Sequence, residues 1–214
     1  MDTATRLPRS KVTATPCSCE NAGAGAGASV QSNGNTVASV QKMKKAKTSI
    51  QSKIKKIKLL LLDVDGVMTD GRIILDNQGN ELKAFHVRDG HGIKLAQRAG
   101  IMVGIITGRK SEVVNVRARE LGIQEVHQGA LDKITVYETL IGKYGLKDDE
   151  VAYMGDDIVD IGIFDRAGVA ATVADSDPAV KPHVDLVMKA AGGRGAVREF
   201  INLILKNRDK LRAP

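Results

Sequence analysis

The sequence predicts an α/β fold in which a parallel sheet is flanked by helices. Two observations lead to this fold class. Along most of the 214 residues, short apolar runs alternate with amphipathic stretches of helical length, a pattern typical of parallel sheets covered on both faces. The first run, residues 57–62, is almost purely apolar, as expected for a strand that is buried on both sides.

The expected elements follow one another regularly after this first strand. The other strands are expected at residues 101–107, 125–128, 151–154, 169–173 and 186–188, and the helices near 91–99, 110–121, 132–144, 158–167 and 195–206. One insertion interrupts the alternation. Residues 72–75 and 81–86 flank the turn-rich segment DNQGN and predict a β-hairpin directly after the first strand and its loop.

No segment of the folded region is long enough to form a separate lid over a site at the sheet. The hairpin is too short for a lid domain. The stretch between residues 107 and 133 has room only for a helix, a short strand and a turn. We therefore expect a fold with a hairpin flap but no cap domain, and a site that stays open unless another subunit covers it.

The chain divides into a basic tail over residues 1–54, expected to be disordered, and one folded domain over residues 55–210. Residues 1–58 hold eleven Lys or Arg and two acids, whereas the remainder holds 21 basic and 23 acidic residues. The net charge of +7 therefore belongs to the tail and does not indicate a nucleic-acid-binding domain. The tail is a transit peptide, an anchor for anionic surfaces or an extension upstream of a start near Met43; we favour the last.

Composition also restricts the location and the partners. Both cysteines, Cys17 and Cys19, lie in the tail, so the folded region suits a reducing compartment. No run of 18 apolar residues is present, which argues against a spanning helix. With no Trp and only three Tyr and three Phe, few side chains could stack on bases. We expect a cytoplasmic protein that binds neither nucleic acid nor membrane.

Four separated segments carry residues suited to phosphoryl chemistry, each at or after the end of an expected strand. They hold Asp63 with Asp65, Thr107 with Arg109, Lys133, and Asp156 with Asp157. The carboxyl ends of parallel strands meet at one edge of the sheet, where ligands bind. Carboxylates there could hold a divalent metal and leave one oxygen free to attack phosphorus. A metal, a Lys and a hydroxyl would stabilise the charge on the transferred group.

The order DVDGV, TGR, Lys and GDD resembles the haloacid dehalogenase superfamily over residues 57 to about 173. The resemblance implies a Rossmann-like core. It also implies that Asp63 is the nucleophile and that Asp65 protonates the leaving oxygen and later activates water. Thr107 and Lys133 would bind the phosphoryl oxygens. Asp156 would hold Mg²⁺ together with Asp63 and the carbonyl of Asp65.

Other interpretations of these residues have less support in the sequence. A calcium loop starting at Asp63 would need Glu at its twelfth position, where Ile74 stands. His86 and His91 could suggest zinc, but no third soft ligand is evident. Asp160 is either a carboxylate that supports the metal site or an acid in the first turn of a helix, and the sequence leaves this open.

A finer resemblance, over roughly residues 55–206, is to the capless 3-deoxy-D-manno-octulosonate 8-phosphate phosphatases. It is carried by ELKAFHVRDGHGIK, ITGRKSEVVNVRARELGI, YMGDD and AGGRGAVRE. The resemblance implies a homotetramer in which the hairpin of one subunit helps to close a neighbouring site. The substrate would be a phosphorylated sugar acid. Implied substrate contacts, besides Asp65 and Lys133, are His86, Val87, Arg88, Asp89, Gly90, Lys94, Arg109 and Arg117.

Some details of this resemblance stay open. His86 stands where related sequences often have Asn. Arg194 either reaches a neighbouring active site or belongs to a flexible glycine loop. A phosphatase for nine-carbon sugar-acid 9-phosphates is the close alternative, and a non-catalytic tetramerisation module is a more distant one.

Overall fold

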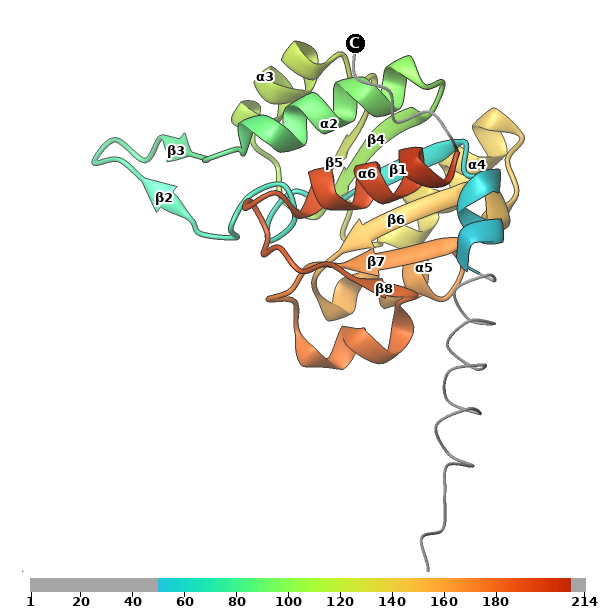
Figure 1. Ribbon diagram of the computed structural model, residues 1–214. Coiled ribbons are helices and arrows are strands. Elements are labelled where there is room, and N and C mark those ends of the chain that lie inside the picture. Colours follow the sequence, from blue (N-terminus) through green and yellow to red (C-terminus); the bar gives the residue numbers. More distant parts are fainter. Residues whose placement is uncertain (1–49, 209–214) are drawn as a thin grey trace, which may run out of the picture.

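The computed structural model describes residues 50–208. Its centre is a six-stranded sheet of order β5-β4-β1-β6-β7-β8, in which all neighbours are parallel (Figure 1). The strands are β1 Leu59–Leu62, β4 Met102–Thr107, β5 Glu125–Gln128, β6 Val151–Gly155, β7 Val169–Thr172 and β8 Leu186–Val187. All six predicted strands are therefore present, and the predicted fold class is confirmed.

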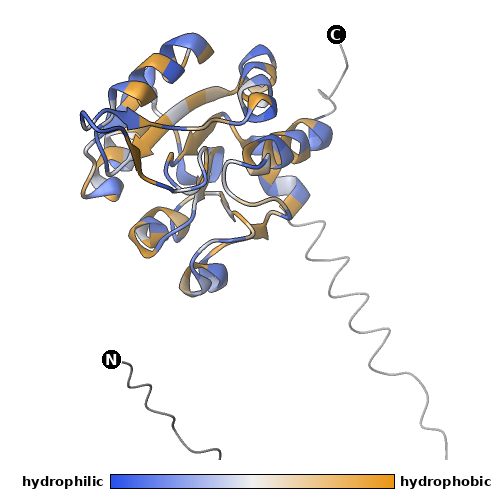
Figure 2. Ribbon diagram, turned by 90° about the vertical axis from the view of Figure 1, so that its left-hand side faces the viewer, coloured by the Kyte–Doolittle hydropathy of each residue, from blue (hydrophilic) through white to orange (hydrophobic). Residues whose placement is uncertain are grey.

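Helices cover both faces of the sheet (Figure 1). α2 (Val87–Arg98), α3 (Glu112–Leu121) and α6 (Ala196–Asn207) share one hydrophobic cluster, and α4 (Lys133–Tyr144) and α5 (Ile161–Phe164) share the other. Figure 2 shows hydrophilic and hydrophobic residues mixed around these helices, as expected for elements with one buried side.

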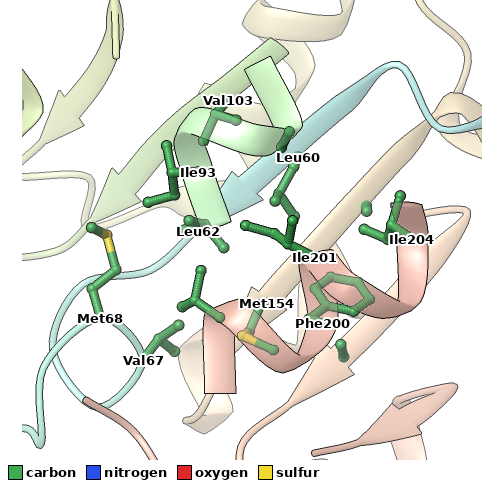
Figure 3. Packing of buried hydrophobic residues seen from close by; sticks show 14 of the residues in the cluster. Leu60, Leu62, Val67, Met68, Ile93, Val103, Met154, Phe200, Ile201 and Ile204 are labelled. Atoms are coloured by element: carbon green, nitrogen blue, oxygen red, sulfur yellow. The ribbon is translucent and has the colours of Figure 1, made fainter. Parts of the chain in front are cut away.

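The side chains of β1 alternate between the two clusters. Leu60 and Leu62 pack with Phe200 on the α2 and α6 side (Figure 3), and Leu59 and Leu61 pack on the opposite side. All four leucines are fully buried. This explains why the first strand has no polar face, and it places the end of β1 in the middle of the sheet.

The hairpin consists of β2 (Ile74–Leu75) and β3 (Glu81–Leu82), which pair antiparallel. It projects from the body beyond the carboxyl ends of the strands (Figure 1). Asp76 holds its turn by accepting hydrogen bonds from the backbone N–H groups of Gln78 and Asn80, each at 2.8 Å. The paired strands are shorter than predicted, because only two residues on each side are in register.

Two predicted helices differ from the observed ones. α2 begins at Val87, four residues before the expected start, because Gly90 and Gly92 lie inside it and weaken its sequence pattern. The helix expected over residues 158–167 is a 3₁₀ turn over Ile158–Asp160 followed by the single-turn α5. Asp157 and Asp160 cap that turn reciprocally, which favours the tighter geometry there.

The expected disordered tail lies mostly outside the described residues. Its last part is structured, since residues 50–56 form a helix with Ile54 fully buried. Lys53 and Lys56 of this helix pair with Asp185 at 2.7 Å and Asp149 at 2.8 Å. Within residues 50–208, no helix is long and apolar enough to cross a membrane.

Candidate active site

Asp63 follows β1 and lies at the centre of a cleft at the carboxyl ends of the strands. Its side chain is 8% exposed. One carboxylate oxygen accepts a hydrogen bond from the Val64 N–H at 2.6 Å, and the other accepts one from Lys133 Nζ at 2.6 Å. Gly66 turns the chain behind it with φ 84°, and a Cβ there would lie 1.9 Å from Asp156 Oδ2. The loop after β1 that carries Asp63 and Asp65 (the acidic loop) can approach the end of β6 this closely only because residue 66 is glycine.

Asp160 joins these elements from beneath the cleft. The residue is fully buried, and its Oδ1 accepts hydrogen bonds from Lys133 Nζ at 2.6 Å and from the Tyr153 hydroxyl at 2.5 Å. Its Oδ2 accepts from the backbone N–H groups of Asp156 at 3.0 Å and Asp157 at 3.2 Å. Since both oxygens are fully engaged, Asp160 orients Lys133 and the start of the loop after β6. Asp160 lies in the first turn after β6, as one of the two alternatives had it, and its side chain is buried against Lys133; its support of a metal site stays a prediction.

The charges around Asp63 are unbalanced. Burial, with Asp160 nearby, raises the pKa of Asp63 to about 6 although Lys133 acts in the opposite direction. Burial and the charges of Asp63 and Asp160 raise the pKa of Asp156 to about 7. Burial opposes the charged form of Lys133, but the two carboxylates that it contacts outweigh this and raise its pKa. Three carboxylates thus share one ammonium group, and the surplus negative charge would be relieved by a cation.

Thr107 and Arg109 complete the cleft from the end of β4. The cleft has a volume of about 270 Å³ and is lined by Asp63, Asp65, Thr107, Arg109, Lys133 and Asp156, with Gly66, Gly71, Gly108, Asp157 and Val159. Thr107 is buried, whereas the Arg109 side chain is 41% exposed at the mouth. The structure therefore brings together the residues of all four segments that the sequence singled out.

Two hairpin residues contact side chains that line the cleft and were not identified individually from the sequence. The Lys83 side chain is 1% exposed, and its Nζ donates a hydrogen bond to Asp65 Oδ1. Glu81 Oε1 lies 2.6 Å from Arg109 and 3.3 Å from Lys83. Residues 81 and 83 share one face of an extended segment. A charged pair at this spacing, directly after the turn-rich segment DNQGN, was the signal that could have revealed them.

The glycine-rich segment before α6 packs against the acidic loop. A Cβ at Gly192 would lie 1.8 Å from the carbonyl oxygen of Gly66. The Gly193 N–H donates to the carbonyl oxygen of Val67 at 3.0 Å. Arg194 lies 3.8 Å from Asp70 and its side chain is 67% exposed. This segment is a close-packed support of the loop, and its arginine points outward.

Seven of the predicted substrate contacts do not line this cleft within one chain. They are His86, Val87, Arg88, Asp89, Gly90, Lys94 and Arg117. Asp89 is buried and accepts a hydrogen bond from the Arg198 N–H at 2.7 Å, so it ties α2 to α6. Arg117 lies over the Phe85 ring at 5.6 Å. Arg88 lines a separate cleft with Arg194, and Lys94 lines another with Tyr144. Their predicted contact with substrate stays a prediction.

Comparison with known proteins agrees with this geometry. A sequence profile of the haloacid dehalogenase-like hydrolases matches residues 111–201. The chain is 45% identical over 164 residues to a 3-deoxy-D-manno-octulosonate 8-phosphate phosphatase of Salmonella typhi, an alignment that covers 77% of this chain and 87% of that protein. The chain belongs to this phosphatase family. The predicted resemblance is thereby confirmed.

Solved structures of this phosphatase family have the same fold. The enzyme of Moraxella catarrhalis, in complex with magnesium, phosphate and 3-deoxy-D-manno-octulosonate, matches with a TM-score of 0.74 and 41% identity over 76% of this chain and 93% of that one. The cobalt-bound enzyme of Haemophilus influenzae matches with a TM-score of 0.71 and 41% identity over 73% and 92% of the two chains.

The donor set of this family member fits a hard divalent cation. Oxygen atoms of Asp63, Asp156 and Asp160 lie within 4.8 Å of one another. Within residues 50–208 no hydrogen-bond donor contacts the Asp156 carboxylate, which leaves its oxygens for a metal. All-oxygen ligands and surplus negative charge suit Mg²⁺. Asp160 belongs to the cluster by distance, but its oxygens are occupied by four donors, so Asp63 and Asp156 are the side chains available to the ion.

Proposed function

We propose that this protein is a Mg²⁺-dependent phosphatase that hydrolyses 3-deoxy-D-manno-octulosonate 8-phosphate, in the synthesis of the lipopolysaccharide core sugar. The observation that carries the proposal is the buried Asp63 carboxylate, held by Lys133 at the centre of a cleft that also contains Asp65, Thr107 and Asp156. The 45% identity to named phosphatases over most of both chains supports the choice of substrate.

The reaction takes two steps on the residues of this chain. An oxygen of Asp63 attacks phosphorus as the ester bond breaks, and Asp65 gives a proton to the departing sugar oxygen. The aspartyl-phosphate is then hydrolysed by water that loses its proton to Asp65. Lys133 and the Thr107 hydroxyl contact the phosphoryl oxygens and stabilise their charge.

Mg²⁺, held by Asp63, Asp156 and the carbonyl of Asp65, would offset the repulsion between a carboxylate nucleophile and a phosphate dianion. Lys133 already neutralises part of that charge at Asp63 Oδ2. Arg109, exposed at the mouth of the cleft, suits the sugar-acid portion of the substrate, because its planar group can bond both oxygens of a carboxylate.

The remaining substrate contacts are proposed to act between subunits of a homotetramer. One chain leaves the cleft open, and the hairpin exposes the large apolar side chains of Ile73, Leu75 and Leu82 by 62%, 58% and 57%. Exposed apolar groups on a projecting element are typical of a protein interface. We further propose a cytoplasmic location, supported by the absence of cysteine from residues 50–208.

The function is tested by a hydrolysis panel with eight- and nine-carbon sugar-acid phosphates and hexose phosphates, each with Mg²⁺ and with EDTA. Preference for the eight-carbon substrate with Mg²⁺, and loss of turnover in Asp63→Asn, is the expected result. Preference for the nine-carbon substrate would favour the alternative, and preference for hexose phosphates would refute the sugar-acid assignment. Full turnover by Asp63→Asn would refute the mechanism.

A further inference from the structure

Lys83 is a buried cation with no role in the chemistry described so far. It directly follows β3, and its side chain is 1% exposed. Burying an ammonium group is costly unless it is paired. The group that pairs with Lys83 therefore indicates the role of Lys83. That partner is Asp65, which accepts a hydrogen bond from Lys83 Nζ.

Four charged groups lie where the hairpin joins the body, here called its base: Asp65, Glu81, Lys83 and Arg109. Arg109 lies 2.6 Å from Glu81 but 3.7 Å from Asp65. Lys83 lies 3.3 Å from Glu81 and closer to Asp65. Of the two cations, Arg109 lies closer to Glu81, and Lys83 lies closer to Asp65, to which it donates a hydrogen bond. The Lys83–Glu81 pair lies within the hairpin itself, whereas the Lys83–Asp65 pair joins the hairpin to the loop after β1 that carries Asp65.

We propose that Lys83 is a positioning residue that holds Asp65 in the orientation for proton transfer. The hairpin would thus serve the active site of its own chain through its base, whatever its tip contacts. The inference rests on the proposed function, in which Asp65 is the acid and base. When Asp63 forms its bond to phosphorus, the electron pair of the breaking ester bond goes to the sugar oxygen. That oxygen takes the proton of Asp65, and the resulting carboxylate stays hydrogen-bonded to Lys83.

Substrates with different leaving groups distinguish a role of Lys83 in positioning Asp65 from a purely structural role of Lys83. An alkoxide needs a proton to leave, whereas p-nitrophenolate, a much weaker base, leaves without one. Misplacing the acid in Lys83→Met should therefore lower kcat/KM about 100-fold for the sugar-acid phosphate. The same variant should lose less than about fivefold with p-nitrophenyl phosphate, whose departure does not depend on general acid catalysis.

Three further variants complete the test. Lys83→Gln retains a hydrogen-bond donor and should show the same selective loss in smaller degree, even if the Met variant folds poorly. Lys58→Met, at the opposite end of the sheet, removes a surface pair with Glu150 and should leave both rates unchanged. In an Asp65→Asn background, Lys83→Met should change kcat/KM for the sugar-acid phosphate by less than about threefold. Both substitutions remove the same function, proton transfer by Asp65.

Several results would overturn the proposal. Equal losses with both substrates would mean that Lys83 acts on phosphoryl binding or on folding. No loss, or full additivity with Asp65→Asn, would mean that it only anchors the hairpin. The wild type is assayed first. If it prefers another alkyl phosphate, the proposed substrate fails and the comparison is made with that compound; if it hydrolyses none, both proposals fail.

Discussion

Replacing Asp160 by Asn tests whether this buried carboxylate organises the active site. Its two oxygens accept four hydrogen bonds, from Lys133, Tyr153 and the backbone N–H groups of Asp156 and Asp157. An amide keeps one oxygen and turns the other into a donor. In one orientation the NH₂ group faces two backbone N–H groups, and in the other it faces the ammonium and the hydroxyl. Neither orientation satisfies all four donors.

The expected loss follows from the donors that are left without a partner. Each unsatisfied buried group costs about 1–3 kcal/mol, and the loop N–H groups are only partly buried, so Asp160→Asn should lose about 3 kcal/mol of unfolding free energy. Tyr153→Phe removes one of the four donors and should lose about 1 kcal/mol. Displacing Lys133 and the loop by about 1 Å should also lower kcat/KM roughly 100-fold in the Asn variant.

Urea unfolding in EDTA, followed by circular dichroism because the chain has no Trp, measures the stability without a contribution from bound metal. Asp157→Asn is the matched control. Asp157 is exposed and caps the 3₁₀ turn by accepting from the Ile158 N–H at 2.7 Å, and Asn caps about as well, so its change should stay within about 0.5 kcal/mol. A loss in Asp160→Asn no larger than that of this control would refute the reasoning.

Three other predictions follow from the same geometry. Lys133→Met should lower kcat at least about 1,000-fold, because it removes the cation at Asp63 and at the phosphoryl oxygens; steady-state assays check this, and near-normal kcat would contradict it. Gly192→Ala should lower kcat at least about tenfold with secondary structure retained, because its Cβ would lie 1.8 Å from the Gly66 carbonyl oxygen. In EDTA the melting temperature should fall as pH rises through 6–7, because the pKa values of Asp63 (about 6) and Asp156 (about 7) are raised. The folded state then binds more protons than the unfolded state in that window, and stability falls as they leave. Excess Mg²⁺ should oppose this fall, and a melting temperature that rises with pH in EDTA would contradict the sign.

The parts of the fold that were predicted correctly depend on local pattern. The apolar run ending at Leu62, and the acids after it, predicted both the central strand and its position at the site. α2 was placed too late because Gly90 and Gly92 conceal its first turns. Gly92 allows α2 to pack closely on α6, since a Cβ at residue 92 would lie 2.9 Å from Arg198 Cδ and 3.4 Å from Arg198 Cα. Tertiary contacts overrode local propensity there.

The site residues that were missed depend on contacts between distant parts of the chain. Lys83 follows a polar turn, where a lysine normally points into solvent, and its burial arises only because the hairpin base folds back to Asp65. Asp160 was ambiguous for the same reason, because an acid in a first helical turn is common. Its burial beneath Lys133 follows from how tightly the chain turns after β6, where a Cβ at Gly155 would lie 2.3 Å from Asp160 Oδ2.

The hairpin bears on two features of the active site: the orientation of the Asp65 side chain and the closure of the cleft. Its base is polar and buried, with Lys83 on Asp65 and Glu81 on Arg109. Farther out it exposes apolar side chains such as Leu75. A partner that covers this apolar part would also restrain the base, because the two are joined by the short strand β3. If the proposed tetramer forms, assembly and the orientation of Asp65 should therefore be coupled. Dilution below the dissociation constant of the tetramer should then slow hydrolysis of the sugar-acid phosphate more than that of p-nitrophenyl phosphate.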